Sequence, residues 1–421
     1  MKQILTLFLV IAIAIAVFAF VPSVGAASKF ETLHRFYDYS NGAHPAAGLA
    51  YDPAGNLYGT TTLGSFGRSR GHGDAFELKP NSDGSWTESL IYTFTGALEG
   101  SYPLGALTLD SAGNLYGTMS QGGANGDAGL VYELTPNGDG TWTDTVLYNF
   151  CSLGNCADGE YPYSSVIFDH SGNLYGTTAI GGTKQLGTVF QLAPNGSKGW
   201  TESVIYSFRD SEDGSRPFAS LIFDQTGNLY GTASGGGRGV GYGVVFRLSP
   251  NQDGSWTHAT LYKFCRLQNC HDGGTPYAGL ALDSAGNLYG TTRDYGAYGY
   301  GNVFELTPNT NGRWSEKVLH QFAGADDGAS PQGGVTLAPA GNLYGTTVAG
   351  GSSNSCNGGC GVVFKLAQDS KGAWHETVIH ALSGSAAVPE STLVFNGSNL
   401  YGTSVGNSVG VNFGAVFEVI P

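Results

Sequence analysis

Charged side chains are scarce in this sequence of 421 residues. Asp, Glu, Lys and Arg together make up 12% of the chain, whereas about a quarter is usual for a globular protein. The 19 Lys and Arg residues are outnumbered by 33 Asp and Glu residues, which gives a net charge of −14, and the basic residues form no cluster. Because such a chain repels polyanions, we expect no nucleic-acid partner.

Helical and membrane-spanning patterns are also missing beyond the first 26 residues. No later stretch shows the 3.6-residue apolar period of an amphipathic helix, and none is long and apolar enough to cross a bilayer. The hydrophobic content of 41% is nevertheless enough for a large core, so disorder is not expected. We therefore predict an all-β chain with no membrane span in its mature part.

The N-terminus has the pattern of an export signal. Lys2 supplies a positive charge, residues 4–21 are almost entirely apolar, and Val24-Gly25-Ala26 offers small residues to a signal peptidase. We predict a signal peptide over residues 1–26 and a single mature domain over residues 27–421, which is secreted, periplasmic or at the cell surface. An uncleaved anchor is the alternative, because a run of about 18 apolar residues nearly spans a bilayer.

Cysteine is also rare, and its six residues fall into three close pairs: Cys151/Cys156, Cys265/Cys270 and Cys356/Cys360. In an exported chain this spacing favours three local disulfides. Zinc sites usually combine two such pairs or add His at fixed spacing, but these pairs lie in different repeats. We therefore expect no metal site and no cofactor.

What the sequence does contain is one motif repeated along its length. Gly-Asn-Leu-Tyr-Gly-Thr occurs six times and a seventh copy is slightly altered, with a period of 55 to 59 residues measured at Tyr58, Tyr116, Tyr175, Tyr230, Tyr289, Tyr344 and Tyr401. Each repeat holds four strand-like segments, for example over residues 278–283, 287–292, 302–306 and 314–322. Four strands repeated seven times predict a seven-bladed β-propeller of four-stranded blades. A solenoid is the alternative, but it would need a shorter period.

Two further patterns concern how the blades pack and how the ring closes. All six Trp residues open the fourth strand of a repeat, where we expect them to pack between neighbouring blades. Residues 30–36 match a fourth strand, whereas residues 414–419 match a third strand. We therefore predict that the N-terminal strand closes the last blade, which would remove the open edges of the ring.

The tandem unit, with its recurring Leu-Tyr-Gly-Thr and Val-Phe-Glu-Leu segments, resembles the bacterial Gloeo/Verruco-type (GloVer) repeat over residues 29–421. The resemblance implies export and display outside the cell by anchors that differ between members. The sequence ends at Pro421 without a visible sorting segment, so we expect release or periplasmic residence here. The resemblance implies no established activity.

We find no catalytic signature in a suitable context. The Gly406–Gly410 segment matches the G-x-S-x-G pattern, but no helical pattern follows it. His375 and His380 are one residue too far apart for a zincin motif, and they lie in a predicted strand. We predict a non-catalytic binding or scaffolding propeller. An extracellular glycan hydrolase or lyase is the alternative, and it should place unlike titratable groups together in one sector.

The candidate binding residues surround a recurring Asp-Gly-x-x-Pro loop. Strand order puts these loops on the same face as the variable loops after Leu-Tyr-Gly-Thr, including residues 65–74 and 293–301. We predict that any ligand site lies on this face, with a carbohydrate or a cell-surface protein as partner. The structural alternative is that Asp-Gly only makes the turn. The candidates are the loop aspartates, the aromatic residues after the prolines and the tyrosines of the second variable loop, namely Asp158, Asp213, Asp272, Asp327, Tyr163, Phe218, Tyr277, Tyr295, Tyr298 and Tyr300.

Overall fold

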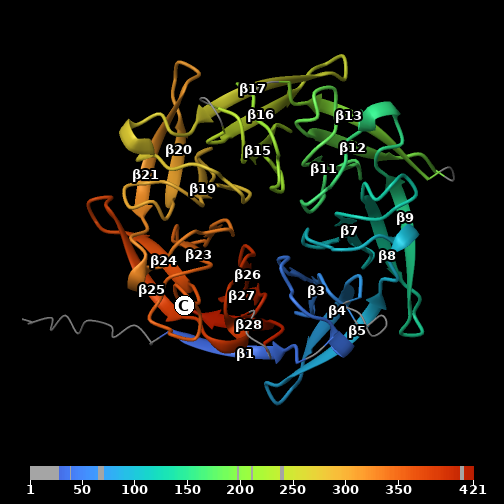
Figure 1. The fold of residues 1–421 in the computed structure, drawn as a ribbon, viewed down its shortest axis with the longest axis horizontal. Helices are drawn as coiled ribbons and strands as arrows, with labels where there is room; N and C mark the ends of the chain where they lie inside the picture. The colour runs from blue at the N-terminus through green and yellow to red at the C-terminus, as the bar shows by residue number, and fades with distance from the viewer. Residues whose placement is uncertain are drawn as a thin grey trace, which may run out of the picture.

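The computed structural model describes residues 28–37, 39–64, 71–196, 199–209, 212–237, 241–407 and 412–421. Within these ranges, seven four-stranded antiparallel sheets stand in a ring around a central channel (Figure 1). The predicted seven-bladed β-propeller is therefore confirmed. The signal peptide predicted over residues 1–26 lies outside the described residues.

Each of the first six blades runs outward from the axis in chain order, and its innermost strand is very short. The strands are β2 (Ala50–Tyr51), β3 (Leu57–Thr61), β4 (Asp74–Pro80) and β5 (Trp86–Thr93) in blade 1; β6 (Thr108–Leu109), β7 (Leu115–Met119), β8 (Leu130–Pro136) and β9 (Trp142–Asn149) in blade 2; β10 (Ile167–Phe168), β11 (Leu174–Thr178), β12 (Thr188–Pro194) and β13 (Trp200–Ser207) in blade 3; β14 (Ile222–Phe223), β15 (Leu229–Ala233), β16 (Val244–Pro250) and β17 (Trp256–Lys263) in blade 4; β18 (Ala281–Leu282), β19 (Leu288–Thr292), β20 (Asn302–Pro308) and β21 (Trp314–Gln321) in blade 5; and β22 (Thr336–Leu337), β23 (Leu343–Thr346), β24 (Val362–Gln368) and β25 (Trp374–Ala381) in blade 6.

Blade 7 joins the two ends of the chain. Its strands are β26 (Val394–Asn396), β27 (Asn399–Ser404), β28 (Ala415–Ile420) and β1 (Lys29–Arg35), in that order from the axis. The antiparallel pairing runs from Lys29 opposite Ile420 to Arg35 opposite Ala415, and Figure 1 shows the blue β1 along the red blade. The predicted closure by the N-terminal strand is confirmed.

In blades 1 to 5 an Asp and the repeated motif together hold the turn between the first two strands. In blade 3 the Asp169 carboxylate accepts hydrogen bonds from the backbone and side-chain amides of Asn173, at 2.9 and 2.8 Å, and from the Tyr175 hydroxyl at 3.1 Å. Gly176 must lack a side chain, because a Cβ there would lie 2.5 Å from the Phe190 ring. The motif is therefore a hydrogen-bonded clasp followed by a close approach of two strands.

Neighbouring blades pack through the predicted tryptophans. Each Trp that opens a fourth strand meets the motif Tyr of the preceding blade edge to face, with ring centres 6.0 to 6.4 Å apart. In blade 7, Phe30 of β1 stacks on His380 of blade 6 at 3.9 Å. The role predicted for the tryptophans is confirmed, and aromatic contacts join the blades around the ring.

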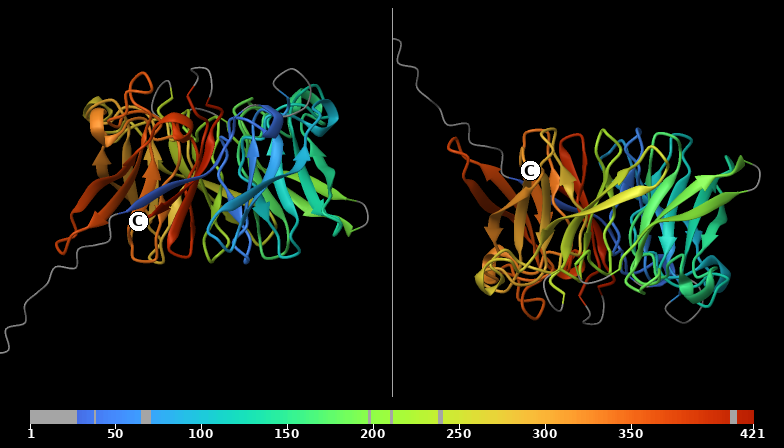
Figure 2. Two further views of the ribbon diagram at one scale, coloured as in Figure 1. Left: turned by 90° about the horizontal axis from the view of Figure 1, so that it is seen from below. Right: turned by 90° about the horizontal axis from the view of Figure 1, so that it is seen from above.

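Short 3₁₀ turns gather on one side of the ring, which we call the loop face (Figure 2). They are η1 (Tyr39–Asn41), η2 (Ala97–Glu99), η3 (Gly154–Cys156), η5 (Gln268–Cys270), η6 (Ala325–Asp327) and η7 (Gly384–Ala386). All three predicted disulfides are present, and those at Cys151–Cys156 and Cys265–Cys270 enclose η3 and η5. The third, Cys356–Cys360, lies between β23 and β24. Among the described residues, no helix has the length and apolar character needed to cross a membrane.

Candidate functional site

Two of the four loop aspartates are fully buried and bonded within their own loops. Asp158 is 0% exposed. It accepts hydrogen bonds from the backbone amides of Ser152 and Leu153, at 2.8 and 3.1 Å, and from the Tyr148 hydroxyl at 2.8 Å. Asp272 is equally buried and has the same partners in the loop that precedes blade 5. It accepts hydrogen bonds from the backbone amides of Arg266 and Leu267 and from the Tyr262 hydroxyl. These two carboxylates fix loops and present no surface to a ligand.

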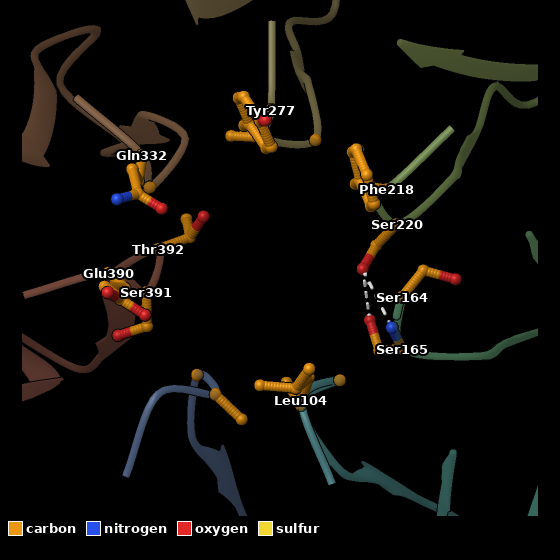
Figure 3. Close-up of a pocket in the computed structure, with 18 of the residues that line it drawn as sticks. Leu104, Ser164, Ser165, Phe218, Ser220, Tyr277, Gln332, Glu390, Ser391 and Thr392 are labelled. Carbon is orange, nitrogen blue, oxygen red and sulfur yellow. Dashed lines mark hydrogen bonds between the residues drawn. The ribbon is translucent and has the colours of Figure 1, made fainter. Parts of the chain in front are cut away.

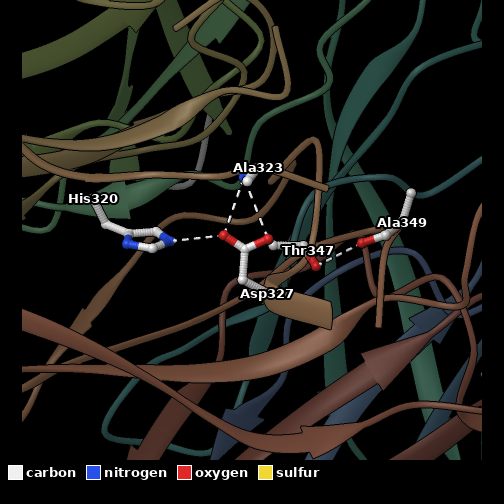
Figure 4. A network of polar contacts seen from close by, with 5 residues as sticks. All are labelled: His320, Ala323, Asp327, Thr347 and Ala349. Carbon is white, nitrogen blue, oxygen red and sulfur yellow. Dashed lines mark hydrogen bonds and ion pairs between the residues drawn. The ribbon is translucent and has the colours of Figure 1, made fainter. Parts of the chain in front are cut away.

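The other two loop aspartates are half-buried but are used in the same way. Asp327 accepts a hydrogen bond from the Ala323 amide at 3.0 Å and lies 3.4 Å from His320 Nε2 (Figure 4). Asp213 accepts from the Arg209 amide at 3.1 Å and from the Tyr206 hydroxyl at 2.5 Å. The turn-making alternative accounts for these contacts, and a ligand role for the four aspartates stays a prediction.

Each loop carboxylate also faces an ionisable side chain on the fourth strand of the next blade. Burial, reinforced by the charge of Asp158, raises the pKa of Glu202 to about 8. The same two causes raise the pKa of the equivalent acids in blades 2, 5 and 6 to about 7. We call these four electrostatically coupled pairs the interblade acid pairs, and they are Glu99/Asp144, Asp158/Glu202, Asp272/Glu316 and Asp327/Glu376. In blade 4 the position is His258, whose pKa burial lowers to about 4.

The residues that follow the loop prolines point into the mouth of the central channel on the loop face (Figure 3). The prolines themselves are buried between blades. Pro217, for example, packs so closely on Gly187 of the preceding blade that a Cβ there would lie 2.6 Å from its ring. This wedge fixes the direction of the next side chain. One residue from each blade therefore lines a cavity of about 400 Å³, namely Ala46, Leu104, Tyr163, Phe218, Tyr277, Gln332 and Glu390.

Three aromatic residues from consecutive blades form one side of this mouth. The Tyr163 and Phe218 rings meet edge to face with centres 5.1 Å apart. Phe218 and Tyr277 are stacked, with centres 5.2 Å apart and planes 11° from parallel. All three side chains remain partly exposed. The structure therefore brings together three of the predicted residues in what we call the aromatic arc.

The side of the mouth across from Phe218 is polar. Gln332 and Glu390 come from blades 6 and 7 (Figure 3). Burial raises the pKa of Glu390, and the charge of Arg293 opposes that rise. The Arg293 guanidinium lies over the Tyr277 ring, 5.2 Å from its centre. These three polar residues are not among the predicted site residues. An alignment of the seven copies on the loop proline would have marked Gln332 and Glu390, because they depart from the aromatic pattern.

Small residues lie one layer below the mouth and leave it open. Ser165 and Ser220 are hydrogen-bonded to each other between blades 3 and 4, and Thr392 accepts a hydrogen bond from the Gly334 amide at 2.8 Å. The residues of this layer that line the cavity are Gly48, Ala106, Ser165, Ser220, Gly279 and Thr392. Hydroxyl and backbone groups are therefore available to a ligand that enters past the aromatic arc.

The second group of predicted tyrosines lies away from the cavity. Tyr295, Tyr298 and Tyr300 are 41%, 61% and 46% exposed, and Tyr295 packs edge to face on Tyr242 at 5.1 Å. None of the three lines the mouth. Residues 65–70 of the first variable loop, and residues 408–411 of the G-x-S-x-G segment, lie outside the described residues. Within the described ranges, no three His, Cys, Asp or Glu residues are grouped as metal ligands.

Comparisons with known proteins identify the repeat family and find solved structures with a similar fold. The sequence profile described as the Gloeobacter/Verrucomicrobia repeat matches residues 16–156, 65–280 and 257–421. A comparison with curated protein sequences finds no significant match.

Three solved structures with a similar fold share 13 to 18% sequence identity with this chain. A Thermus thermophilus protein described as an oxidoreductase (glucose dehydrogenase) is 18% identical, with a TM-score of 0.45 over 79% of this chain and 97% of that one. The periplasmic gluconolactonase of Pseudomonas aeruginosa is 15% identical, with a TM-score of 0.46 over 80% and 84%. The PorZ component of the type-IX secretion system of Porphyromonas gingivalis is 13% identical, with a TM-score of 0.47 over 88% and 46%. At this level the likeness concerns the fold alone.

Proposed function

The chain belongs to the Gloeobacter/Verrucomicrobia repeat family, and we propose that it is an exported, non-catalytic propeller that binds a carbohydrate in the mouth of its central channel. The observation that carries this proposal is the aromatic arc facing Gln332 and Glu390 across one open cavity. Three intact disulfides support a location outside the cytoplasm.

The mouth combines the two kinds of surface that a sugar presents. A pyranose ring has apolar C–H faces, which aromatic side chains can cover, and a rim of hydroxyl groups, which need hydrogen-bond partners. Tyr163 and Phe218 supply partly exposed aromatic surface. Gln332, Glu390 and Thr392 supply donors and acceptors from the facing blades. Pockets with mostly apolar walls and a few convergent polar groups are typical of small-molecule sites.

The mouth is also where the seven repeats differ in chemistry. The motif clasp recurs in blades 1 to 5, and the Trp–Tyr contact recurs at six of the interfaces between blades. The post-proline position instead changes from Ala to Leu, to three aromatic residues, to Gln and to Glu. A purely structural ring has no need of this asymmetry, whereas an unsymmetrical ligand does.

The hydrolase or lyase alternative has less support from this cavity. Glycoside hydrolysis uses two carboxyl groups about 5 to 10 Å apart. Of the described residues that line the mouth, Glu390 is the one acid. The interblade acid pairs do not supply a second, because they lie between blades and do not line the cavity.

Binding of the mature domain to a panel of oligosaccharides, measured by titration calorimetry, tests the proposal. Phe218→Ala and Gln332→Ala should each weaken the best ligand by about ten-fold or more, since each removes a direct contact. Tyr37→Ala is the matched control, because Tyr37 is 69% exposed and outside the cavity. Absence of binding to every sugar, or full affinity in both mouth variants with unchanged melting temperatures, would refute the proposal.

A further inference from the structure

The wall of the channel is continuous from blade to blade, because the last residue of the repeated motif joins each blade to the next. In all seven blades the hydroxyl of this Thr donates a hydrogen bond to a backbone carbonyl of the next blade, at 2.7 to 3.3 Å. The acceptor is the carbonyl of the loop proline or of the residue two positions after it. Thr177, for example, donates to Pro217, and Thr403 of blade 7 donates to Ala47 of blade 1. A ligand therefore enters the cavity along the channel axis, past the mouth.

The cavity continues inward from the mouth. In blade 4 residues 218–222 all line it, and in blade 7 residues 390–394 do so as well. These segments lead from the mouth to the first residues of the innermost strands β14 and β26. The side chains below the mouth are small, and those of Ala106, Ser220 and Thr392 line the cavity there. The space of about 400 Å³ is therefore a well surrounded by all seven blades.

The shape of a site decides which part of a polymer it can hold. A groove that is open at both ends accepts an internal stretch of a chain, whereas a well accepts a segment that can be inserted from one side. In an unbranched polysaccharide only the end of the chain can be inserted in this way. An internal residue lying across the mouth would reach Phe218 and Gln332 but not the hydroxyls of Ser220 and Thr392 below them. Small-molecule sites bury most of their ligand's surface, and the inserted end satisfies that condition.

We propose that the channel mouth binds the end of an unbranched carbohydrate chain, with the terminal residue inside the well and the rest of the chain leading away from the loop face. This inference rests on the proposed carbohydrate-binding function and adds which part of the chain is recognised. The terminal ring would lie between the aromatic arc and Gln332. Its free end would face the hydroxyls one layer below, which can both donate and accept hydrogen bonds.

The first test uses linear hexasaccharides with one end blocked. The probes are cellohexaose, maltohexaose and β-1,4-linked mannohexaose, each free, joined through its reducing end to albumin, or carrying a trityl ether on its non-reducing terminal residue. For a hexasaccharide that binds, one of the two blocks should weaken binding about ten-fold or more, and the other should change it by less than about two-fold. Cyclomaltohexaose, which has no end, should bind at least about ten-fold more weakly than maltohexaose if maltohexaose binds. This comparison needs no variant, so misfolding cannot confuse it.

The outcomes separate the two proposals. Equal loss with both blocks, or full affinity with both, would overturn the chain-end inference and leave sugar binding in place. If none of the free hexasaccharides binds, both proposals fail.

A second test fills the well without changing the mouth residues. Ala106 lines the cavity two positions after Leu104, so Ala106→Phe should weaken the free hexasaccharide about ten-fold or more. Ala112→Phe is the matched control, because Ala112 is exposed in the turn between β6 and β7 of the same blade, on the side of the ring away from the loop face. Full affinity in Ala106→Phe, with a melting temperature equal to that of the control, would show that the sugar lies across the mouth and would overturn the chain-end inference.

Discussion

Raising the pH should lower the free energy of unfolding of the propeller, because one carboxyl group of each interblade acid pair has a raised pKa in the folded state. Glu202 has a pKa near 8 in the structure against an ordinary 4.5. One oxygen of each fourth-strand acid in these pairs is enclosed without a hydrogen-bond partner among the described residues. An ionised carboxylate would need such a partner, whereas a carboxylic acid does not need one at each oxygen.

The direction follows from the raised pKa values. A carboxyl group that holds its proton more tightly when folded contributes its full stability below the unfolded pKa, near 4.5. That contribution is lost as the pH rises through the folded values of about 7 to 8. The free energy of unfolding should therefore fall from mildly acidic to mildly alkaline solution.

The size of the effect can be bounded from Glu202. Each tenfold change in proton affinity is worth about 1.4 kcal/mol, so the raised pKa corresponds to at most ~5 kcal/mol. Glu202 is half-buried, and screening by solvent reduces this to ~2 kcal/mol. Four pairs then sum to roughly 5 to 8 kcal/mol, a large share of the usual stability of a folded domain.

Thermal unfolding followed by circular dichroism between about pH 5 and about pH 9 measures this slope. The net charge of −14 also disfavours the folded state at high pH, so the slope must be assigned with variants. Glu202→Gln should flatten it, because the amide cannot ionise. Asp83→Asn is the control, since Asp83 lies in an exposed hairpin where hydrogen bonds from Ser85 lower its pKa. A melting temperature that is constant or rises with pH, or equal slopes in both variants, would refute the reasoning.

Three further predictions concern the fold. Deleting residues 27–37 should prevent stable folding, since β28 would lose its outer partner β1 and expose an open edge; a melting temperature within a few degrees of the full chain would contradict the closure role. Replacing Cys151 and Cys156 by Ser should lower the free energy of unfolding by about 2 kcal/mol and leave a folded protein, which denaturant titration would measure. Loss of the folded state would show that this disulfide is required for folding. Gly187→Ala should cost more than Gly172→Ala in the same titration. Both glycines have positive φ, but a Cβ at 187 would lie 2.5 Å from a carbonyl oxygen whereas a Cβ at 172 meets nothing within 4 Å; equal losses would show that backbone strain alone decides.

The architecture was predictable because its signals are periodic and local. The spacing of Tyr58, Tyr116 and their equivalents sets the number of blades, and the recurring tryptophans mark where each fourth strand begins. The disulfides were predictable for the same reason, since four or five positions separate the partners. The closure by β1 followed from recognising a fourth strand at one end of the chain and a third strand at the other.

The candidate site was only partly predictable, because exposure is decided by contacts that a pattern does not show. The sequence marks Asp158 as a loop residue, but its burial depends on the Tyr148 hydroxyl and on amides of the preceding turn. Glu390 was not predicted as a site residue because blade 7 has no Asp-Gly pair before its proline. Arg293 is positioned by Tyr277, which precedes it by 16 residues in the sequence and lies beside it only once blade 5 folds.

The pairing of β1 with β28 also has a consequence in time. Lys29 belongs to the first described strand to be synthesised, yet its partner Ile420 lies in the last described strand. Until β28 has been synthesised, β1 has no strand partner, whereas the six blades that lie between them in the sequence can already form. During this interval the incomplete ring is open to proteases and to wrong strand partners. We therefore expect the ring to close only after β28 has been synthesised and has paired with β1.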